Sequence, residues 1–450
     1  MIRAGILTLA LAVLFVGLAL AAPPAHTAMR SSSVGLTLIT EPDAGIAPIY
    51  ALLRSAHKSV DLVIYELEDT QATAILAADA QRGVRVRVLL DSHFVGHYNK
   101  PAYSYLRSHG VDVRWASSRF DLTHEKAIVI DGKLAAIMTM NLTSRYYSST
   151  RDFVLVDRGS GDVKAVEATF ATDWAGGGSA RTSPADLVWS PGAQGALVAL
   201  IASAQHTLLV ENEEMGDQAV ISALEAAARR GVAVEIVMTR QSTWTGAFNA
   251  LERAGVKVRT YASSASLYIH AKAIAVDPDL SGQRVFVGSQ NFSLASLLYN
   301  RELGLITPQP AIVADIAAVI SRDGAGATPW SPSPTPTPTP APTPSPSPTG
   351  EVLTTVSASV SNPTPQKDSS VTASCKALDQ HGAPISGAQA TFTWHYKTTT
   401  PVESAMTDST GVASCTRDIG NATSGYFVSI TISVSYSGVV LTTSTGFTPR

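Results

Sequence analysis

Apolar runs alternate with amphipathic, Ala-rich segments between about residue 35 and residue 323. Val60–Tyr65 is an apolar, β-branched run typical of a buried strand. Thr70–Arg82 has helical periodicity, and Gly83 follows it in the position of a helix C-cap. Val84–Leu90 and Val111–Trp115 indicate the next two strands. Strands that alternate with helices in this way predict an α/β fold.

Three further apolar segments complete this first group of elements. We expect strands over His124–Ile130, Ala135–Met140 and Phe153–Val156. Side chains two residues apart share one face of a strand, so His124 and Lys126 are expected to point the same way.

The same order of elements then occurs a second time. Val60–Glu66 aligns with Leu208–Glu214, and the helices, glycines and later strands follow in matching order. The repeat predicts two αβ halves, over residues 35–180 and 181–323, related by a pseudo-twofold axis.

Each half carries the same polar residues at matched spacings. The first set is His124, Lys126, Asp131, Asn141 and Asp152, and the second is His270, Lys272, Asp277, Asn291 and Glu302. A His can act as nucleophile or proton donor, and Lys and Asn can hold phosphate oxygens. A carboxylate can orient a His through the far ring nitrogen. One His in a strand is more often structural, but two copies in register favour a site that attacks a phosphodiester.

The two Asp residues of these sets call for a different interpretation. Asp131 and Asp277 lie five residues beyond their Lys, which is ~16 Å along a strand. We therefore expect them to be structural, ending a strand or pairing with a base, rather than catalytic.

These residues resemble the phospholipase D superfamily, whose HxKxxxxD…GSxN motif occurs twice per active site. The second copy, with Gly288, Ser289 and Asn291, fits at every position, whereas the first has Met138 in place of Gly and Thr139 in place of Ser. Thr keeps the hydroxyl, but Met138 adds bulk near the site and puts substrate access in question. The resemblance covers about residues 36–323.

The resemblance implies a duplicated αβ sandwich and a covalent phosphohistidine. It assigns His124 as nucleophile and His270 as general acid, with Asp152 and Glu302 orienting them. Lys126, Lys272, Asn141 and Asn291 would hold the phosphate, so no metal and no cofactor is expected. Thr139 and Ser289 either add a hydrogen bond or are ordinary packing residues.

Charge and cysteine content narrow the substrate class. The net charge is −3, and residues 35–323 hold 26 Lys and Arg against 30 Asp and Glu. A dedicated nucleic-acid binder usually has a basic excess, although a local basic cleft is compatible with this sum. This part has no Cys, which excludes cysteine chemistry. We expect a monomeric phosphodiesterase that acts on phospholipid headgroups and contacts a membrane surface; the alternatives are an endonuclease of the same superfamily and an inactive, surface-displayed binding protein.

The N-terminal segment indicates export. Arg3 precedes the apolar run Ile6–Leu20, and small residues at Ala19 and Ala21 form a cleavage site, so residues 1–22 are predicted to be a secretory signal peptide. The alternative is a retained membrane anchor, because the run approaches the ~20 residues needed to span. The protein is expected to be secreted or held at the cell surface.

The last part of the chain differs in composition. Residues 324–350 are predicted to be a Pro, Thr and Ser-rich linker. Residues 351–450 are predicted to be all-β and resemble bacterial immunoglobulin-like modules that bind surfaces or act as spacers. In a secreted protein Cys375 and Cys415 are expected to form a disulfide; the alternative is two buried free thiols. The expected strands are Leu353–Val360, Ser370–Ala377, Ala390–Tyr396, Gly411–Thr416, Tyr426–Tyr436 and Val439–Phe447.

Overall fold

Contacts divide the chain into two compact units, Met1–Thr335 and Pro336–Arg450. The computed structural model describes residues 32–33, 35–177, 184, 186–332, 351–396, 399, 401–420, 422–437 and 439–450. The predicted signal peptide and most of the predicted linker lie outside these residues. No helix in the described ranges has the length and apolarity needed to cross a bilayer.

The first half of the first unit is a nine-stranded mixed sheet with helices. Its strand order is β1-β2-β8-β7-β6-β3-β4-β5, and β13 from the second half pairs with β8. The strands are β1 (Ser32–Ser33), β2 (Leu36–Glu41), β3 (Ser59–Ile64), β4 (Arg85–Leu90), β5 (Asp112–Trp115), β6 (Ala127–Ile130), β7 (Leu134–Met138) and β8 (Thr150–Asp157). The helices are α1 (Ala47–Arg54), α2 (Thr70–Gln81), α3 (Gly96–Ser108), η1 (Ser144–Tyr146) and α4 (Ser160–Trp174).

The second half repeats this plan as an eight-stranded sheet. Its strand order is β17-β12-β11-β10-β14-β15-β16-β9. The strands of this sheet are β9 (Leu187–Ser190), β10 (Thr207–Glu211), β11 (Ala233–Thr239), β12 (Lys257–Tyr261), β14 (Ala273–Val276), β15 (Arg284–Gly288), β16 (Glu302–Thr307) and β17 (Thr328–Pro329). Strand β13 (Tyr268–Ile269) pairs with β8 of the first sheet. The helices are α5 (Ala193–Ser203), α6 (Gln218–Arg229), η2 (Ser242–Trp244), α7 (Thr245–Arg253), α8 (Leu294–Leu298) and α9 (Pro310–Gly326).

Strand register confirms the predicted duplication. Val63 of β3 lies opposite Ala127 of β6, and Glu211 of β10 lies opposite Ala273 of β14 in the same antiparallel arrangement. In both halves the central strand also pairs in parallel with the next one, β3 with β4 and β10 with β11. The alignment of Val60–Glu66 with Leu208–Glu214 therefore holds in three dimensions.

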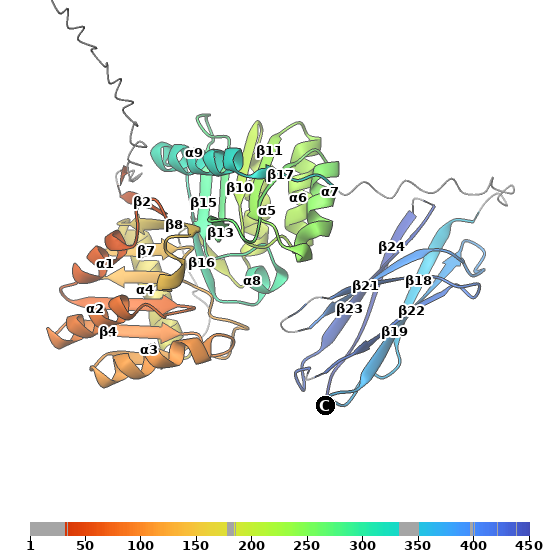
Figure 1. Ribbon diagram of the computed structural model, residues 1–450, viewed down its shortest axis with the longest axis horizontal. Helices are drawn as coiled ribbons and strands as arrows, with labels where there is room; N and C mark the ends of the chain where they lie inside the picture. The colour runs from red at the N-terminus through yellow and green to blue at the C-terminus, as the bar shows by residue number, and fades with distance from the viewer. Residues whose placement is uncertain are drawn as a thin grey trace, which may run out of the picture. The chain divides into compact units, whose positions relative to one another are not determined.

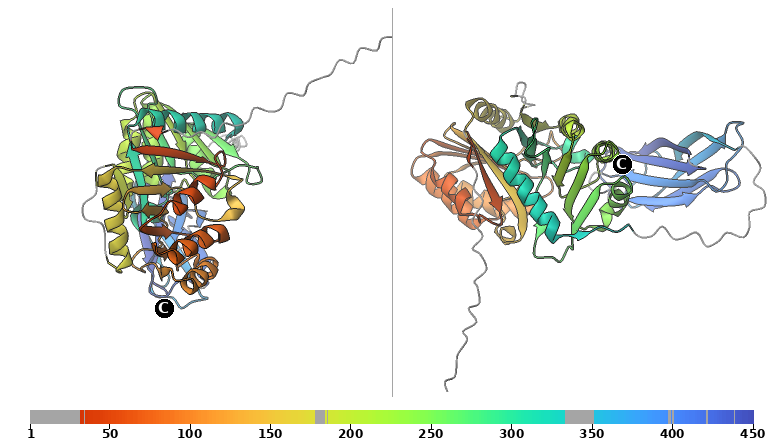
Figure 2. Two further views of the ribbon diagram at one scale, coloured as in Figure 1. Left: turned by 90° about the vertical axis from the view of Figure 1, so that its left-hand side faces the viewer. Right: turned by 90° about the horizontal axis from the view of Figure 1, so that it is seen from above.

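The two sheets share one hydrophobic core. Apolar residues of both sheets, such as Phe153 and Val287, pack together with residues of α4 and α9. Helices α1, α2 and α3 cover the outer side of the first sheet, and α5, α6 and α7 cover the outer side of the second (Figures 1 and 2). Each buried side chain of this size contributes about 1.5–3 kcal/mol to the free energy of unfolding. The shared core therefore holds the two halves together.

The predicted strand over His124–Ile130 is wrong at its start. Strand β6 begins at Ala127, and β14 likewise begins after Lys272. The backbone N–H of His124 donates to the Arg301 carbonyl at 2.9 Å, because the start of this segment pairs with the other half of the unit.

The structural role predicted for Asp131 and Asp277 is confirmed. The Asp277 carboxylate accepts backbone N–H groups of Gln205, His206 and Thr207 at 2.7–2.8 Å. Asp131 does the same for residues 57–59. These backbone bonds hold the pKa of both carboxyls below the usual range in spite of burial. Each Asp therefore ties a strand end to the loop that leads into the neighbouring strand.

Replacing Asp277 should cost stability and not catalysis. Asp277→Ala leaves three N–H groups without their acceptor, so we expect a loss of about 2 kcal/mol in the free energy of unfolding. Urea titration measures this loss, and turnover of a soluble phosphodiester should be kept well below the unfolding temperature. A variant of unchanged stability with abolished turnover would contradict the structural role.

The predicted linker begins later than expected. Helix α9 runs to Gly326, and β17 then pairs with β12. The Trp330 indole Nε1 donates to Asn249 Oδ1 at 2.9 Å. The indole ring lies edge-on to the Phe248 ring, with 5.3 Å between the ring centroids. The chain is therefore still packed on the first unit beyond Gly324.

A truncation series should show this boundary. A chain ending at Pro332 keeps β17 and Trp330, and its first unit is expected to melt as in the full-length protein. In a chain ending at Ala325, the free energy of unfolding of the first unit should fall by about 2–3 kcal/mol, because the contacts of the Trp330 indole are gone. Scanning calorimetry measures both, with Trp330→Ala in the full chain as the matched control. Equal melting temperatures for the two truncations would overturn the assignment.

The second unit is all-β, as predicted. It has a three-stranded sheet of order β18-β19-β22 and a four-stranded sheet of order β21-β20-β23-β24, both antiparallel. Strand β21 was not anticipated from the sequence. The immunoglobulin-like assignment stays a prediction. The bounds are β18 (Leu353–Val360), β19 (Ser370–Asp379), β20 (Gln389–His395), β21 (Val402–Met406), β22 (Val412–Asp418), β23 (Val428–Tyr436) and β24 (Val439–Phe447).

The predicted disulfide is wrong, because both cysteines are free thiols. They stand on adjacent strands of one sheet, but Cys375 lies opposite Ala413, and Cys415 lies opposite Ala373. The pair is therefore diagonal, and burial raises the pKa of both thiols.

Candidate active site

The two His residues of the repeated motif are each bound to a carboxylate of the other half. His124 Nδ1 lies 2.8 Å from Glu302 Oε2, and His270 Nδ1 lies 2.7 Å from Asp152 Oδ1. A carboxylate at Nδ1 fixes the ring and leaves Nε2 available for chemistry. The site therefore exists only where the two halves meet.

Backbone contacts set up these crossed pairs. The N–H of His270 donates to the Arg151 carbonyl at 3.2 Å, as that of His124 does to Arg301. Each of these arginines directly precedes the orienting carboxylate, so the backbone bond brings the carboxylate to the His of the other half.

The same two arginines form buried ion pairs between the halves. Arg301 Nη2 donates to Asp173 Oδ1 of α4 at 2.8 Å, and Arg151 Nη2 donates to Asp323 Oδ1 of α9 at 3.2 Å. The side chains of all four residues are almost completely buried. Breaking one such pair costs about 3–5 kcal/mol. These four residues belong to no recognisable sequence motif, so sequence reasoning missed them.

The two motif lysines are buried beside their His residues. Lys126 Nζ donates to the His124 carbonyl at 2.6 Å, and Lys272 Nζ donates to the His270 carbonyl. Burial lowers the pKa of Lys126 to about 7, although Glu302 opposes the shift. An incoming phosphate would restore the charge of this ammonium.

The carboxylates are charged in spite of their burial. Burial acts to raise the pKa of Asp152, but His270, Lys272 and Thr139 outweigh it and hold the pKa below the usual range. The pKa of Glu302 is held below its usual range in the same way by His124 and Lys126.

The surroundings of His124 favour its neutral form. Burial lowers its pKa, and the neighbouring Lys126 adds to the effect, while Glu302 only partly opposes it. A neutral ring that donates from Nδ1 presents its lone pair at Nε2, which is the form that a nucleophile requires.

The two asparagines follow the strands next to the His segments. Asn141 comes shortly after β7, and Asn291 shortly after β15. The side-chain Oδ1 of each is buried without a partner among the described residues. Their predicted role in holding phosphate oxygens stays a prediction.

The motif hydroxyls support the carboxylate strands. Thr139 Oγ1 donates to Asp152 Oδ1 at 2.5 Å and accepts the Phe153 N–H at 2.9 Å. Ser289 Oγ accepts the Leu303 N–H at 3.1 Å, next to Glu302. The hydroxyl matters because it fixes the strand that carries the orienting carboxylate.

The departure at Met138 does not crowd the site. Its side chain is fully buried in the core under the outer helices, where it packs with Ala136 and Val154. In the second half these positions hold Gly288, Phe286 and Gly304, and a Cβ on Gly288 would lie 2.8 Å from the Phe286 ring. The halves thus exchange a large and a small residue within one packed volume.

Two residues that the motif does not include contact the His and Lys pairs. The Tyr65 ring lies 4.6 Å from the His124 ring, with Lys126 Nζ 5.1 Å from its centroid. Glu213 Oε2 lies 3.0 Å from Lys272 Nζ and 3.6 Å from His270 Nε2. Sequence reasoning missed both, although each directly precedes an aligned Glu at the end of a central strand.

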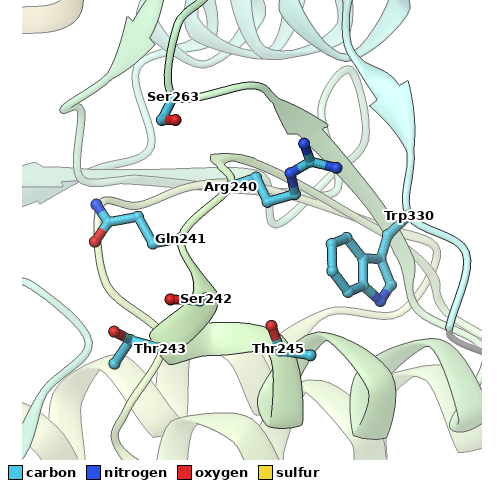
Figure 3. Close-up of a pocket in the computed structure, with 7 residues that line it drawn as sticks. All are labelled: Arg240, Gln241, Ser242, Thr243, Thr245, Ser263 and Trp330. Atoms are coloured by element: carbon cyan, nitrogen blue, oxygen red, sulfur yellow. The ribbon is translucent and has the colours of Figure 1, made fainter.

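A cavity of about 640 Å³ opens at the C-terminal ends of β11 and β12 (Figure 3). Ligands of α/β sheets bind at this edge of parallel strands. Gln241 of its lining donates from Nε2 to the Tyr268 hydroxyl at 3.1 Å, and that hydroxyl donates to Glu213 at 2.9 Å. The cavity is therefore connected to the His270 side of the site. It is lined by Arg240, Gln241, Ser242, Thr243, Thr245, Ser263 and Trp330.

The repeated site agrees with comparisons to known proteins. The family model described as "Cardiolipin synthase, PLD-like domain" matches residues 49–174 and again residues 197–323. The chain belongs to the phospholipase D superfamily. It is thus an enzyme of a family that transfers or cleaves phosphodiesters, as expected from the paired motifs.

Relatives of this superfamily member include cardiolipin synthase A of Klebsiella pneumoniae subsp. pneumoniae. The two are 26% identical over 341 residues, which cover 63% of this chain and 68% of the relative. Cardiolipin synthase A of Salmonella arizonae matches with the same identity and coverage.

Two solved structures share the fold of this phospholipase D-like chain. Phosphatidylserine synthase from Haemophilus influenzae has a TM-score of 0.52 at 13% identity, covering 68% of this chain and 90% of that one. Polyphosphate kinase from Porphyromonas gingivalis also has a TM-score of 0.52, at 16% identity, covering 64% of this chain and 46% of the kinase.

Binding of a phosphodiester should weaken above neutral pH. Lys126 holds its proton below a pKa of about 7 and loses it as the pH rises, so KM for a soluble diester is expected to increase above pH 7. Steady-state kinetics between pH 6 and 9 measure this, and Lys126→Arg should flatten the rise by staying charged. A KM that is constant over this range would contradict the role of Lys126.

Proposed function

We propose that this protein is a secreted phospholipase D-type phosphodiesterase that cleaves phospholipid headgroups through a phosphohistidine on His124. The observation that carries the proposal is the pair of imidazoles whose Nδ1 atoms are held by carboxylates of the opposite half. Two oriented Nε2 atoms supply one nucleophile and one proton donor.

In the first step, His124 Nε2 attacks phosphorus, and the bond from phosphorus to the headgroup oxygen breaks. His270 gives its Nε2 proton to that leaving oxygen, so the headgroup departs as a neutral alcohol. Lys126 and Lys272 lie beside the two rings, where they offset the charge that builds on the non-bridging oxygens.

In the second step, His270, now neutral, takes a proton from water, and the hydroxide attacks phosphorus as the phosphorus–nitrogen bond to His124 breaks. Phosphatidic acid leaves, and both rings return to their starting states. An alcohol in place of water gives a new phosphodiester by the same bond changes.

Phospholipid is favoured over nucleic acid on charge. The net charge of the chain is −3, and carboxylates stand beside the site: Glu213 on one side, Glu66 and Glu68 on the other. Arg145 is engaged by the latter two. These carboxylates take up the cations that a polyanion would need, whereas a lipid brings only a single phosphate to the site. The relatives named cardiolipin synthase support the lipid class.

The same proposal covers location. The predicted signal peptide would export the enzyme, and the all-β second unit would attach it to a surface. Release of headgroups outside the cell is the activity that this arrangement serves.

The decisive experiment compares substrates and traps the intermediate. Full-length protein is expected to release headgroup and phosphatidic acid from phosphatidylglycerol or phosphatidylcholine vesicles, with or without EDTA, and to leave plasmid DNA intact. His124→Ala should lower turnover by at least about 10³-fold, while His57→Ala, an exposed His, should not.

Labelled substrate should leave an acid-labile phosphate on the His270→Ala protein. Label on the His124→Ala protein instead would reverse the two roles. Cleavage of DNA without cleavage of lipid would replace the proposal by a nuclease.

A further inference from the structure

The two halves also differ at a position outside the motif that is in contact with the catalytic rings. Val63 and Glu211 occupy the same place in their sheets, opposite Ala127 and Ala273. Two residues further on, the first half has Tyr65 and the second has Glu213, so these two side chains are structural counterparts.

The counterparts give the two rings different electrostatic surroundings. Tyr65 presents an uncharged ring to His124, and burial raises the pKa of its hydroxyl above the usual range. Glu213 presents a carboxylate 3.6 Å from Nε2 of His270. His270 thus has a carboxylate at each ring nitrogen, Asp152 at Nδ1 and Glu213 near Nε2, whereas His124 has one.

We propose that Glu213 is a positioning residue that holds His270 in its protonated form, and thereby makes His270 the proton donor and His124 the nucleophile. This inference rests on the proposed function and assigns its two roles. A neighbouring opposite charge within about 4–6 Å favours the charged form of an imidazole, and acid–base pairs work when their surroundings differ.

Other charged groups also lie near His270. Lys272 lies two residues along the same segment, and its ammonium is paired with Glu213 at 3.0 Å, so the ring and the ammonium share this carboxylate. Lys126 and Glu302 belong to the other His pair and oppose each other. Asp152 acts in the same direction as Glu213.

Glu213 is held in place by hydrogen bonds. Tyr268 donates its hydroxyl to Oε1 at 2.9 Å, while Lys272 donates to Oε2. Lys272 and His270 outweigh burial and hold the pKa of Glu213 far below its usual range. The carboxylate is therefore charged and aimed at the side of His270 from which a proton must leave.

The charge pattern also separates the two lysines. Lys272 is neutralised by Glu213, whereas the ion pairs of the described residues include no carboxylate for Lys126. A phosphate oxygen therefore finds its uncompensated ammonium on the His124 side, where the new bond forms. The leaving group lies on the Glu213 side, next to the cavity that Gln241 lines.

The test uses leaving groups that differ in their need for an acid. Full-length Glu213→Gln is assayed on a p-nitrophenyl diester, whose leaving group needs no proton, and on an alkyl diester, whose leaving group does. We expect kcat to fall about 10- to 100-fold for the alkyl ester and less than about 3-fold for the nitrophenyl ester. The alkaline limb of the kcat profile should move down by about one pH unit.

Glu214→Gln is the matched control, because it removes a carboxylate one residue away that has no ion pair with His270 or Lys272 among the described contacts. It should leave the alkaline limb in place. Glu213→Asp should recover part of the alkyl-ester activity, because it restores the charge on a shorter side chain.

An equal loss for both esters, or an unmoved alkaline limb, would overturn the inference while leaving the proposed function standing. If the wild-type protein cleaves neither ester, the proposed function fails instead. Titration of His270 by histidine-selective NMR then tests the role of Glu213 without any turnover. The midpoint of the His270 titration should fall in Glu213→Gln and stay unchanged in Glu214→Gln. An unchanged midpoint in both variants would reject the role of Glu213.

Discussion

The active site depends on one arrangement, the exchange of orienting carboxylates between the two halves. His124 is held by Glu302 and His270 by Asp152, at 2.8 and 2.7 Å. Neither half alone can orient its imidazole, so the chemistry requires the docked pair. The shared core between the sheets provides that docking, and the buried pairs of Arg151 and Arg301 with α9 and α4 fix its register. Stability of this interface and competence of the site are therefore the same physical requirement.

A duplicated site must also lose its symmetry, because two identical rings cannot act as nucleophile and acid at once. The motif residues that contact the rings change little between the halves: Asp152 and Glu302 are both charged and both bind an Nδ1. The larger difference lies just outside the motif, where an aromatic ring in one half is a carboxylate in the other. The crossed pairs give both rings the same geometry, and in our proposal the difference between Tyr65 and Glu213 at a strand end assigns them different roles.

Much of the first unit followed from sequence because its repeat encodes strand order and motif spacing together. The α/β halves, the all-β second unit and the structural Asp131 and Asp277 were predicted. The crossed pairing was not, since spacing along a chain does not report which half supplies a carboxylate. The strand over His124–Ile130 failed because its first residues bond to the other half, and the disulfide failed because strand register placed Ala413 opposite Cys375. The expectation that Met138 would crowd the site was wrong, because its bulk is compensated by the small Ala136, two residues away on the same strand.

Hydrolysis and transfer use the same residues in this geometry, so the choice between them is a matter of access. In the proposed mechanism, His270 is neutral after the headgroup leaves and deprotonates whichever hydroxyl reaches phosphorus opposite His124. Glu213 lies beside His270, and hydrogen bonds through Tyr268 and Gln241 connect it to a cavity bounded by hydroxyl side chains, an arginine and an indole. A small alcohol bound there would be delivered to the ring in place of water. We therefore expect the groups around this cavity, and not the paired motifs, to determine which product the proposed phosphohistidine gives.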